Sequence, residues 1–145
     1  MAVRYLARRD YSRAELTQRL TRRGIEPEAI AQALDALTAA GLLSDTRYAV
    51  SVVAQRAGRY GKRAIAYALK ERGVDATAAE AALAPLAGVD EFDDALALWQ
   101  QRFGVTPANN REKARHVRFL QSRGYALSVV LKVLRKAGAR DLDDA

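Results

Sequence analysis

The sequence contains no cysteine and a single histidine, His116. Without cysteine the chain can form neither disulfides nor thiolate metal sites, and one histidine cannot by itself build a histidine-based zinc site. No apolar run approaches the roughly 20 residues that a membrane-spanning helix needs. The first ten residues, MAVRYLARRD, contain an acid and lack the apolar stretch of a signal peptide. We therefore expect a soluble cytoplasmic protein that uses no metal or cofactor and does not contact a membrane.

Patterns typical of enzymes and of β-sheets are absent as well. Neither glycine-rich phosphate-binding motif occurs, GxxxxGK followed by Ser or Thr, or GxGxxG. No nucleophile or orienting acid is evident beside His116, which we expect to be a partly buried structural residue. Sustained period-two alternation and Asn-Gly or Asp-Gly hairpin turns are also missing. An enzyme is therefore not expected, and the predicted fold class is all-α.

The sequence does contain a repeat of about fifty residues. Gly24, Gly73 and Gly124 lie 49 and 51 residues apart, and each directly follows an arginine and stands four residues after a leucine. Beyond each glycine, mostly apolar positions recur at i, i+3, i+4 and i+7, the spacing of the buried stripe of an amphipathic helix. In the first repeat these positions are Ile30, Ala33, Leu34 and Leu37.

Each repeat is predicted to contain three helices, with the leading helices at residues 2–8, about 45–57 and about 91–103. Three-helix units of this size have marginal cores, and stacking of neighbours is the usual way to stabilise them. The predicted fold is therefore three tandem three-helix repeats that form an elongated, curved solenoid-like molecule. The predicted boundaries are 1–43 for repeat 1, 44–88 for repeat 2, 89–138 for repeat 3 and 139–145 for an acidic C-terminal tail.

Capping residues predict several helix boundaries. Ser12 and Glu15 have the spacing of a capping box and predict the start of the middle helix of repeat 1, which is expected to end at Gly24. Two further pairs with this spacing predict the start of the third helix of repeat 2 and of the middle helix of repeat 3: Thr77 with Glu80, and Asn109 with Glu112.

The chain carries a net charge of +7, and its cations gather in two segments. Residues 52–72 contain six Lys or Arg against one acid, and residues 111–136 contain eight against one. Most such runs are solvated faces. Here the cations recur in the middle helix of successive repeats, which favours a binding face for a polyanion or an acidic protein surface. The predicted face comprises Arg13, Arg23, Arg56, Arg59, Lys62, Arg63, Lys70, Arg72, Arg111, Lys113, Arg115, Arg118 and Arg123.

The stretch RYGKR at 59–63 places cations at a helix start, where they oppose the helix dipole. Gly61 aligns with Ser12 and is an acceptable N-cap residue, while Tyr60, like the aligned Tyr11, is expected to pack on its own helix as a hydrophobic staple. These structural roles leave three cations unexplained: Arg59, Lys62 and Arg63. Side-chain cations and backbone N–H groups together at a helix start suit a phosphate or a carboxylate.

Three stretches around the repeated glycines resemble the RecX family of bacterial regulatory proteins: YLARRDYSRAELTQRLTRRGI, RAGRYGKRAIAYALKERGV and RFLQSRGYALSVVLKVLR. The resemblance covers nearly the whole chain, in the family's order. It implies tandem three-helix repeats and a modulator of RecA. Such a protein mainly inhibits the recombinase, ATPase and co-protease activities of RecA by binding in the groove of the RecA–DNA filament. The resemblance also implies a basic binding face, in agreement with the predicted cations.

Some features depart from the family pattern or leave alternatives open. The chain begins directly at the first repeat, so any role of an N-terminal extension is expected to be absent or to have been lost. Asn109 and Asn110 stand where repeat 2 has YGK, so the helix-start site is expected to be best developed in repeat 2. The charge also fits a general nucleic-acid-binding protein without RecA specificity. We expect a monomer whose binding to bare single- or double-stranded DNA is weaker and electrostatic.

Overall fold

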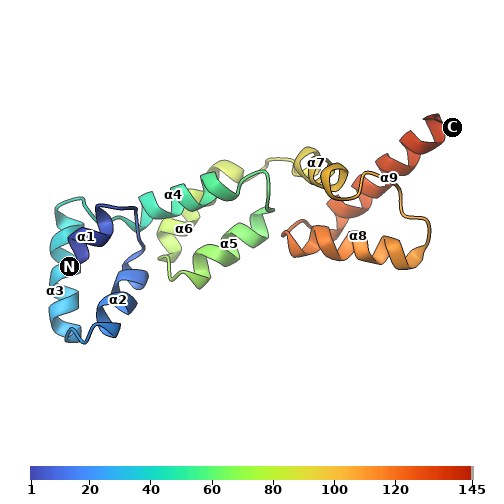
Figure 1. Ribbon diagram of the computed structural model, residues 1–145. Helices are drawn as coiled ribbons and strands as arrows, with labels where there is room; N and C mark the ends of the chain where they lie inside the picture. Colours follow the sequence, from blue (N-terminus) through green and yellow to red (C-terminus); the bar gives the residue numbers. More distant parts are fainter. Residues whose placement is uncertain (145) are drawn as a thin grey trace. The chain divides into compact units, whose positions relative to one another are not determined.

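The computed structural model is helical over the part of the chain that it describes, the backbone of residues 1–144 and the side chains of residues 1–138 (Figure 1). This range contains nine α-helices, one short 3-10 helix and no strand beyond an isolated bridge. The all-α prediction is therefore confirmed. The chain divides into two compact units: unit 1 comprises Met1–Gln55 and Ala66–Pro85, and unit 2 comprises Arg56–Ile65 and the chain from Leu86 onward.

Repeat 1 lies in unit 1 and contains α1 (Ala2–Leu6), α2 (Arg13–Arg22) and α3 (Pro27–Ala39). The predicted capping box is present at the start of α2: the Ser12 hydroxyl accepts from the Glu15 N–H, and the Glu15 carboxylate accepts from the Ser12 N–H. The core contains the predicted apolar positions of the two longer helices, namely Leu16 and Leu20 from α2 with Ile30, Leu34 and Leu37 from α3.

Repeat 2 contains α4 (Asp45–Arg56), α5 (Lys62–Glu71) and α6 (Ala76–Leu83), followed by the 3-10 helix η1 (Ala84–Leu86). The division between the units falls within α5, after Ile65. The part of repeat 2 in unit 1 has its own core, which includes Tyr48, Val52, Leu69, Val74 and Ala82.

The predicted start of α6 is wrong. Asp75 rather than Thr77 is the N-cap residue, and its carboxylate accepts from the Thr77 N–H at 2.8 Å. Aspartate is among the most favoured N-cap residues, and its short carboxylate reaches an N–H in the first turn, so the helix begins ahead of Thr77. The predicted start of α8 is confirmed, because the Asn109 side chain accepts from the Glu112 N–H at 2.9 Å.

Repeat 3 contains α7 (Phe92–Arg102), α8 (Asn110–Ser122) and α9 (Leu127–Asp144), which pack together within unit 2. All three helices contribute to the core, including Ala95, Trp99, Leu120, Val130 and Val133. The backbone of α9 continues through residues 139–144, where the sequence suggested a separate acidic tail. The side chains of that tail lie outside the described residues.

The recurrent leucine of repeat 2, Leu69, is fully buried at 0% exposure. We predict that Leu69→Ala lowers the free energy of unfolding by about 2–5 kcal/mol, because it removes buried carbon atoms and leaves a cavity. Chemical denaturation would measure the loss. Tyr67→Ala is the control, because Tyr67 lies on the same helix with 64% of its surface exposed. A Leu69→Ala midpoint equal to that of the parent would show that α5 packs by another face.

Candidate functional site

The N-terminus of α2 is closed by groups of unit 1 itself. The Ser12 hydroxyl donates to the Arg72 carbonyl at 2.8 Å. The Arg13 N–H donates to the Asp45 carboxylate at 2.8 Å, and the second oxygen of Asp45 accepts from the Asp75 N–H at 3.2 Å. One carboxylate thus satisfies N–H groups at the starts of α2 and α6, where the helix dipole favours negative charge. Asp45 therefore fastens repeat 1 to repeat 2 within unit 1.

The N-terminus of α5 is closed in a similar way within unit 2. The Gly61 N–H donates to the Arg123 carbonyl at 2.6 Å, and the Lys62 N–H donates to the Glu91 carboxylate at 3.0 Å. Glu91 is the residue directly before α7. A helix start attracts an anion, and here the chain supplies its own. Two backbone N–H groups of the anion site predicted at RYGKR, those of Gly61 and Lys62, are therefore already bonded within the chain.

The contact between Gly61 and the end of α8 depends on the absence of side chains. Gly61 is buried, and a Cβ atom there would collide with the carbonyl group of Gly124. Gly124 has a φ of 91°, and a Cβ atom on it would collide with Ala64. Backbones can come this close, and adopt this φ, most readily at glycine. The glycine that ends α8 therefore also forms the seat for the start of α5.

Tyr60 is half-buried, and its role as a staple stays a prediction, whereas the aligned Tyr11 is buried in the core of repeat 1. The guanidinium groups of Arg56 and Arg123 each lie 5.0 Å from the centre of the Tyr60 ring. Both contacts are in the range of cation–π interactions, which favour arginine. Tyr60 therefore holds two arginines of the predicted binding face in place within unit 2.

The predicted cations fall into two groups. Some serve the fold: Arg13 forms an ion pair with Asp35 at 2.7 Å, and Arg72 donates to the Tyr48 hydroxyl at 3.4 Å. Others have no ion-pair partner among the described residues. These side chains are Arg23, Arg56, Arg59, Lys62, Arg63, Lys70, Arg111, Lys113, Arg115, Arg118 and Arg123.

Three of the unpaired cations form a stripe on α8. Arg111, Arg115 and Arg118 follow the spacing i, i+4, i+7 and line one hollow of unit 2. Residues at this spacing share a helix face. Glu112 lines the same hollow, but its carboxylate accepts from the Ala108 N–H at 2.8 Å and thereby helps to close the start of α8. The α8 stripe thus presents three positive charges to solvent.

Sequence reasoning missed Arg102. Its guanidinium lies 5.6 Å from the centre of the Phe119 ring, and that of Arg123 lies 5.3 Å from the same ring. Arg102 escaped the sequence pattern because it ends α7, outside the two cation-rich segments. The i, i+4 spacing of Phe119 and Arg123 at the end of α8 indicates a ring beside Arg123, but no local pattern indicates that Arg102 joins them.

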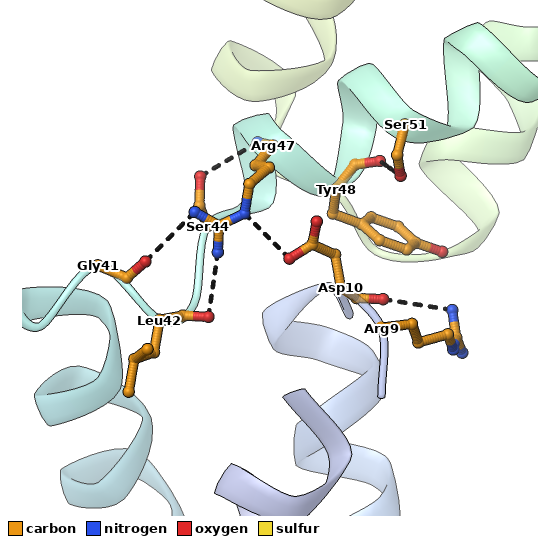
Figure 2. Close-up of polar contacts among 8 residues, drawn as sticks. All are labelled: Arg9, Asp10, Gly41, Leu42, Ser44, Arg47, Tyr48 and Ser51. Atoms are coloured by element: carbon orange, nitrogen blue, oxygen red, sulfur yellow. Dashed lines mark hydrogen bonds and ion pairs between the residues drawn. The ribbon is translucent and has the colours of Figure 1, made fainter. Parts of the chain in front are cut away.

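Arg47 shows how a cation can be fully committed to the fold (Figure 2). Its guanidinium donates to the carbonyls of Gly41 and Leu42 at 3.2 and 3.1 Å, and its Nε donates to the Asp10 carboxylate at 3.0 Å. These bonds tie the end of α3 to the loop before α2, all within unit 1. Arg47 is therefore bonded within the fold of unit 1.

His116 is buried, as expected of a structural residue. Its Nδ1 accepts from the Trp99 indole N–H at 3.0 Å, and its ring stacks on Phe103 with the centres 3.7 Å apart. Burial, with the nearby Arg115 as a smaller cause, lowers the pKa of His116 below its usual value. The neutral imidazole is therefore part of the packing of repeat 3.

Two other kinds of feature are missing from the described part of the chain. None of its helices combines the length and the apolar character needed to cross a membrane. Within the same residues, no group of three or more histidine, aspartate or glutamate side chains is gathered so that it could hold a metal ion.

Comparison with known proteins gives consecutive matches along the chain. Three family models match: RecX, first three-helix domain, at residues 1–37; RecX, second three-helix domain, at 44–83; and RecX, third three-helix domain, at 89–134. A regulatory protein RecX of Leptothrix cholodnii is 45% identical over 94% of this chain and 86% of its own length. One from Pseudomonas savastanoi pv. phaseolicola is 42% identical over 97% and 91%.

Solved structures agree on the fold. The crystal structure of RecX from Lactobacillus salivarius matches with a TM-score of 0.76 over 95% of this chain and 92% of that one, at 19% identity. A second crystal structure, of a regulatory protein RecX, has a TM-score of 0.79 over 91% of this chain and 68% of that one. At this level of identity the likeness supports the tandem three-helix architecture.

The glycine contact predicts the effect of a single methyl group. We expect Gly61→Ala to lower the free energy of unfolding of unit 2 by about 1–3 kcal/mol, since the added carbon overpacks the start of α5 against Gly124. Gly138→Ala is the control, because nothing lies within 4 Å of a Cβ atom there and alanine favours the helix. Thermal unfolding of both variants would check this, and equal midpoints would contradict the close approach.

The buried imidazole predicts a pH dependence of stability. The unfolded chain takes up a proton on His116 as the pH falls below about 6.5, whereas the folded chain resists it because its pKa is lowered. Stability should therefore fall with pH from about 6.5 and level off below the folded pKa. The fluorescence of Trp99, the chain's one tryptophan, would follow unfolding between about pH 7 and 5. His116→Gln should abolish this dependence. A parent midpoint that is constant over this range would refute it.

Proposed function

Because the chain belongs to the RecX family of regulatory proteins, we propose that it binds the filament that RecA forms on DNA and lowers the recombinase, ATPase and co-protease activities of RecA. The observation that carries this proposal is the set of cations in unit 2 that have no acidic partner among the described residues. They lie around the start of α5 and along the α8 stripe.

The charge distribution fits a polyanionic partner. A protein filament that contains DNA carries phosphate charge, and a basic surface accelerates encounter with such a partner and strengthens binding at low salt. Cations that already pair with the chain's own acids, as Arg13 does with Asp35, contribute less to such a field. The unpaired arginines and lysines are therefore the residues on which we expect binding to depend.

The proposed mechanism needs binding and no chemical step. A body that lies across neighbouring RecA protomers would obstruct the rearrangements that accompany ATP hydrolysis and strand exchange. The relatives are named regulatory proteins, which agrees with a role of this kind. Both the start of α5 and the α8 stripe belong to unit 2, so one unit carries most of the unpaired charge.

A second candidate is a general nucleic-acid-binding protein without RecA specificity. The same cations favour it, because phosphate contacts give affinity without sequence selectivity. The two candidates differ in what they bind best at matched salt. A filament regulator should bind RecA on DNA far more tightly than bare DNA. A general binder should bind both alike and should affect other DNA-dependent ATPases to a similar extent.

We predict that Lys62→Glu combined with Arg63→Glu abolishes inhibition of RecA-driven ATP hydrolysis and strand exchange. Both residues lie in the first turn of α5 and neither side chain has an ion-pair partner among the described residues. Reversal replaces attraction for phosphate by repulsion. Glu91 lies beside the Lys62 N–H, so Lys62→Gln with Arg63→Gln should also be tested, because it removes charge without adding a neighbouring carboxylate. Circular dichroism would establish that both variants keep their helicity.

The matched control is Arg135→Glu with Lys136→Glu. These adjacent, exposed cations lie on α9 of the same unit and are not part of the predicted face. Their reversal changes net charge equally and should leave inhibition nearly intact. If the Lys62 and Arg63 variants inhibit RecA as strongly as the parent protein does at physiological salt, the binding face lies elsewhere.

A further inference from the structure

Arginines and aromatic rings alternate across the surface of unit 2. The series runs Arg56, Tyr60, Arg123, Phe119, Arg102, and we refer to it as the cation–ring ladder. Each guanidinium lies 5.0 to 5.6 Å from the centre of the ring next to it. Arg56 and Tyr60 come from the end of α4 and the turn that follows it, Phe119 from α8, Arg123 from the residue directly after α8, and Arg102 from the end of α7. The ladder therefore draws on three separate segments of unit 2.

The ladder concentrates positive charge without neutralising it. No carboxylate forms an ion pair with Arg56, Arg102 or Arg123 among the described residues. Arg102 and Arg123 lie over the same ring, so their like charges repel one another across a short distance. The rings offset part of this repulsion by cation–π attraction. An anion that bridges the two guanidiniums would remove the remainder.

The rings also orient the arginines. A guanidinium that lies against a ring keeps the N–H groups at its edge free, and these form the fork that matches a phosphate. Arg123 has Tyr60 and Phe119 as neighbours, and its own carbonyl is held by Gly61. Its side chain is therefore restricted before any ligand arrives, which lowers the entropy cost of binding.

A groove lies beside this part of the ladder. It has a volume of about 450 Å³ and is lined by Leu98, Gln101, Arg102, Phe119 and Arg123. Two of these side chains are cations, one is an amide, and Leu98 and Phe119 are half-buried apolar groups. Such a lining suits a ligand in which an anionic group is linked to a planar ring with hydrogen-bonding groups at its edge. A nucleotide within a strand has this chemistry.

We propose that Arg102 and Arg123 bind a phosphate of single-stranded nucleic acid, with the adjoining base in the groove against Leu98 and Phe119 and within reach of Gln101. Single-strand sites commonly combine cations with aromatic side chains on which bases pack. A duplex keeps its bases stacked inside, so it can supply the phosphate but not the base. An acidic protein segment would meet the arginines but would leave the groove without a flat partner.

The inference rests on the proposed function, because binding to the RecA filament would bring the chain to DNA. It deepens that function by naming a site for a single strand. It differs from the predicted helix-start site, because Arg102 was outside that prediction and the groove lies between α7 and α8 residues. The experiment therefore uses no RecA. A failure of the strand-binding site is then seen separately from a failure of filament regulation, which the ATPase assay reports.

Fluorescence anisotropy with a labelled 20-nucleotide oligothymidylate would test the site. For Arg102→Gln with Arg123→Gln we expect the Kd to rise at least about tenfold. The magnitude of the slope of log K against log salt should fall by about 0.7, because one phosphate of the single strand is no longer neutralised. The control, Arg135→Gln with Lys136→Gln, removes equal charge and should change the Kd by less than about threefold, since an uninvolved charge acts only through the screened long-range field. Unfolding midpoints would show that both proteins are folded.

Two further experiments test whether a base contributes to binding and whether the planar guanidinium groups of Arg102 and Arg123 are needed. An abasic oligonucleotide of the same length should bind the parent about tenfold more weakly than oligothymidylate, because stacking of a base contributes affinity. Arg102→Lys with Arg123→Lys keeps the charge but loses the planar fork, so it should lose affinity while keeping its salt dependence.

Several results would overturn the proposal. Glutamine variants that bind as the parent does would show that the arginines are not used. If the abasic strand or a 20-base-pair duplex binds as tightly as oligothymidylate, no base occupies the groove. Displacement of oligothymidylate by polyglutamate at equal charge would assign the site to an acidic protein segment instead.

Discussion

A hydrogen bond from the Gly61 N–H to the Arg123 carbonyl joins the start of α5 to the end of α8 within unit 2, and the contact between Tyr60 and Arg123 depends on this approach. The two backbones meet closely because neither Gly61 nor Gly124 carries a side chain. The contact places Tyr60, one residue earlier, beside the Arg123 guanidinium, which also lies near Phe119. A constraint on backbone packing thereby decides which arginines are ordered on the surface.

The helix starts follow a similar rule. Asp45 and Glu91 each satisfy the first N–H of a middle helix from the beginning of the following repeat. A helix start that faces another repeat would otherwise carry unsatisfied donors and an uncompensated dipole. The acids therefore have a structural role at the repeat junctions, and neither junction leaves that N–H for a ligand.

Positive charge on this chain has three different environments. Arg13 and Arg47 pair with acids or helix-end carbonyls and belong to the fold of unit 1. Arg102 and Arg123 are held by rings, which preserve their charge and restrict their orientation. The α8 stripe extends into solvent without ion pairs among the described residues. The positive charge of this chain thus comes from cations that stabilise the fold, cations that lie against aromatic rings, and cations that extend into solvent and contribute to a long-range field.

The sequence alone determined the all-α class, the three repeats, the helix end at Gly24, and the buried stripe that includes Ile30 and Leu34, because helical periodicity and capping are local properties. It did not determine the start of α6, where Asp75 competed with Thr77. Only the tertiary structure showed that Glu91 closes α5, that Tyr60 lies between two arginines and that Arg102 joins Arg123 at Phe119. Those pairings join residues from different segments, and their distances are set by how closely helices pack, which no local pattern records.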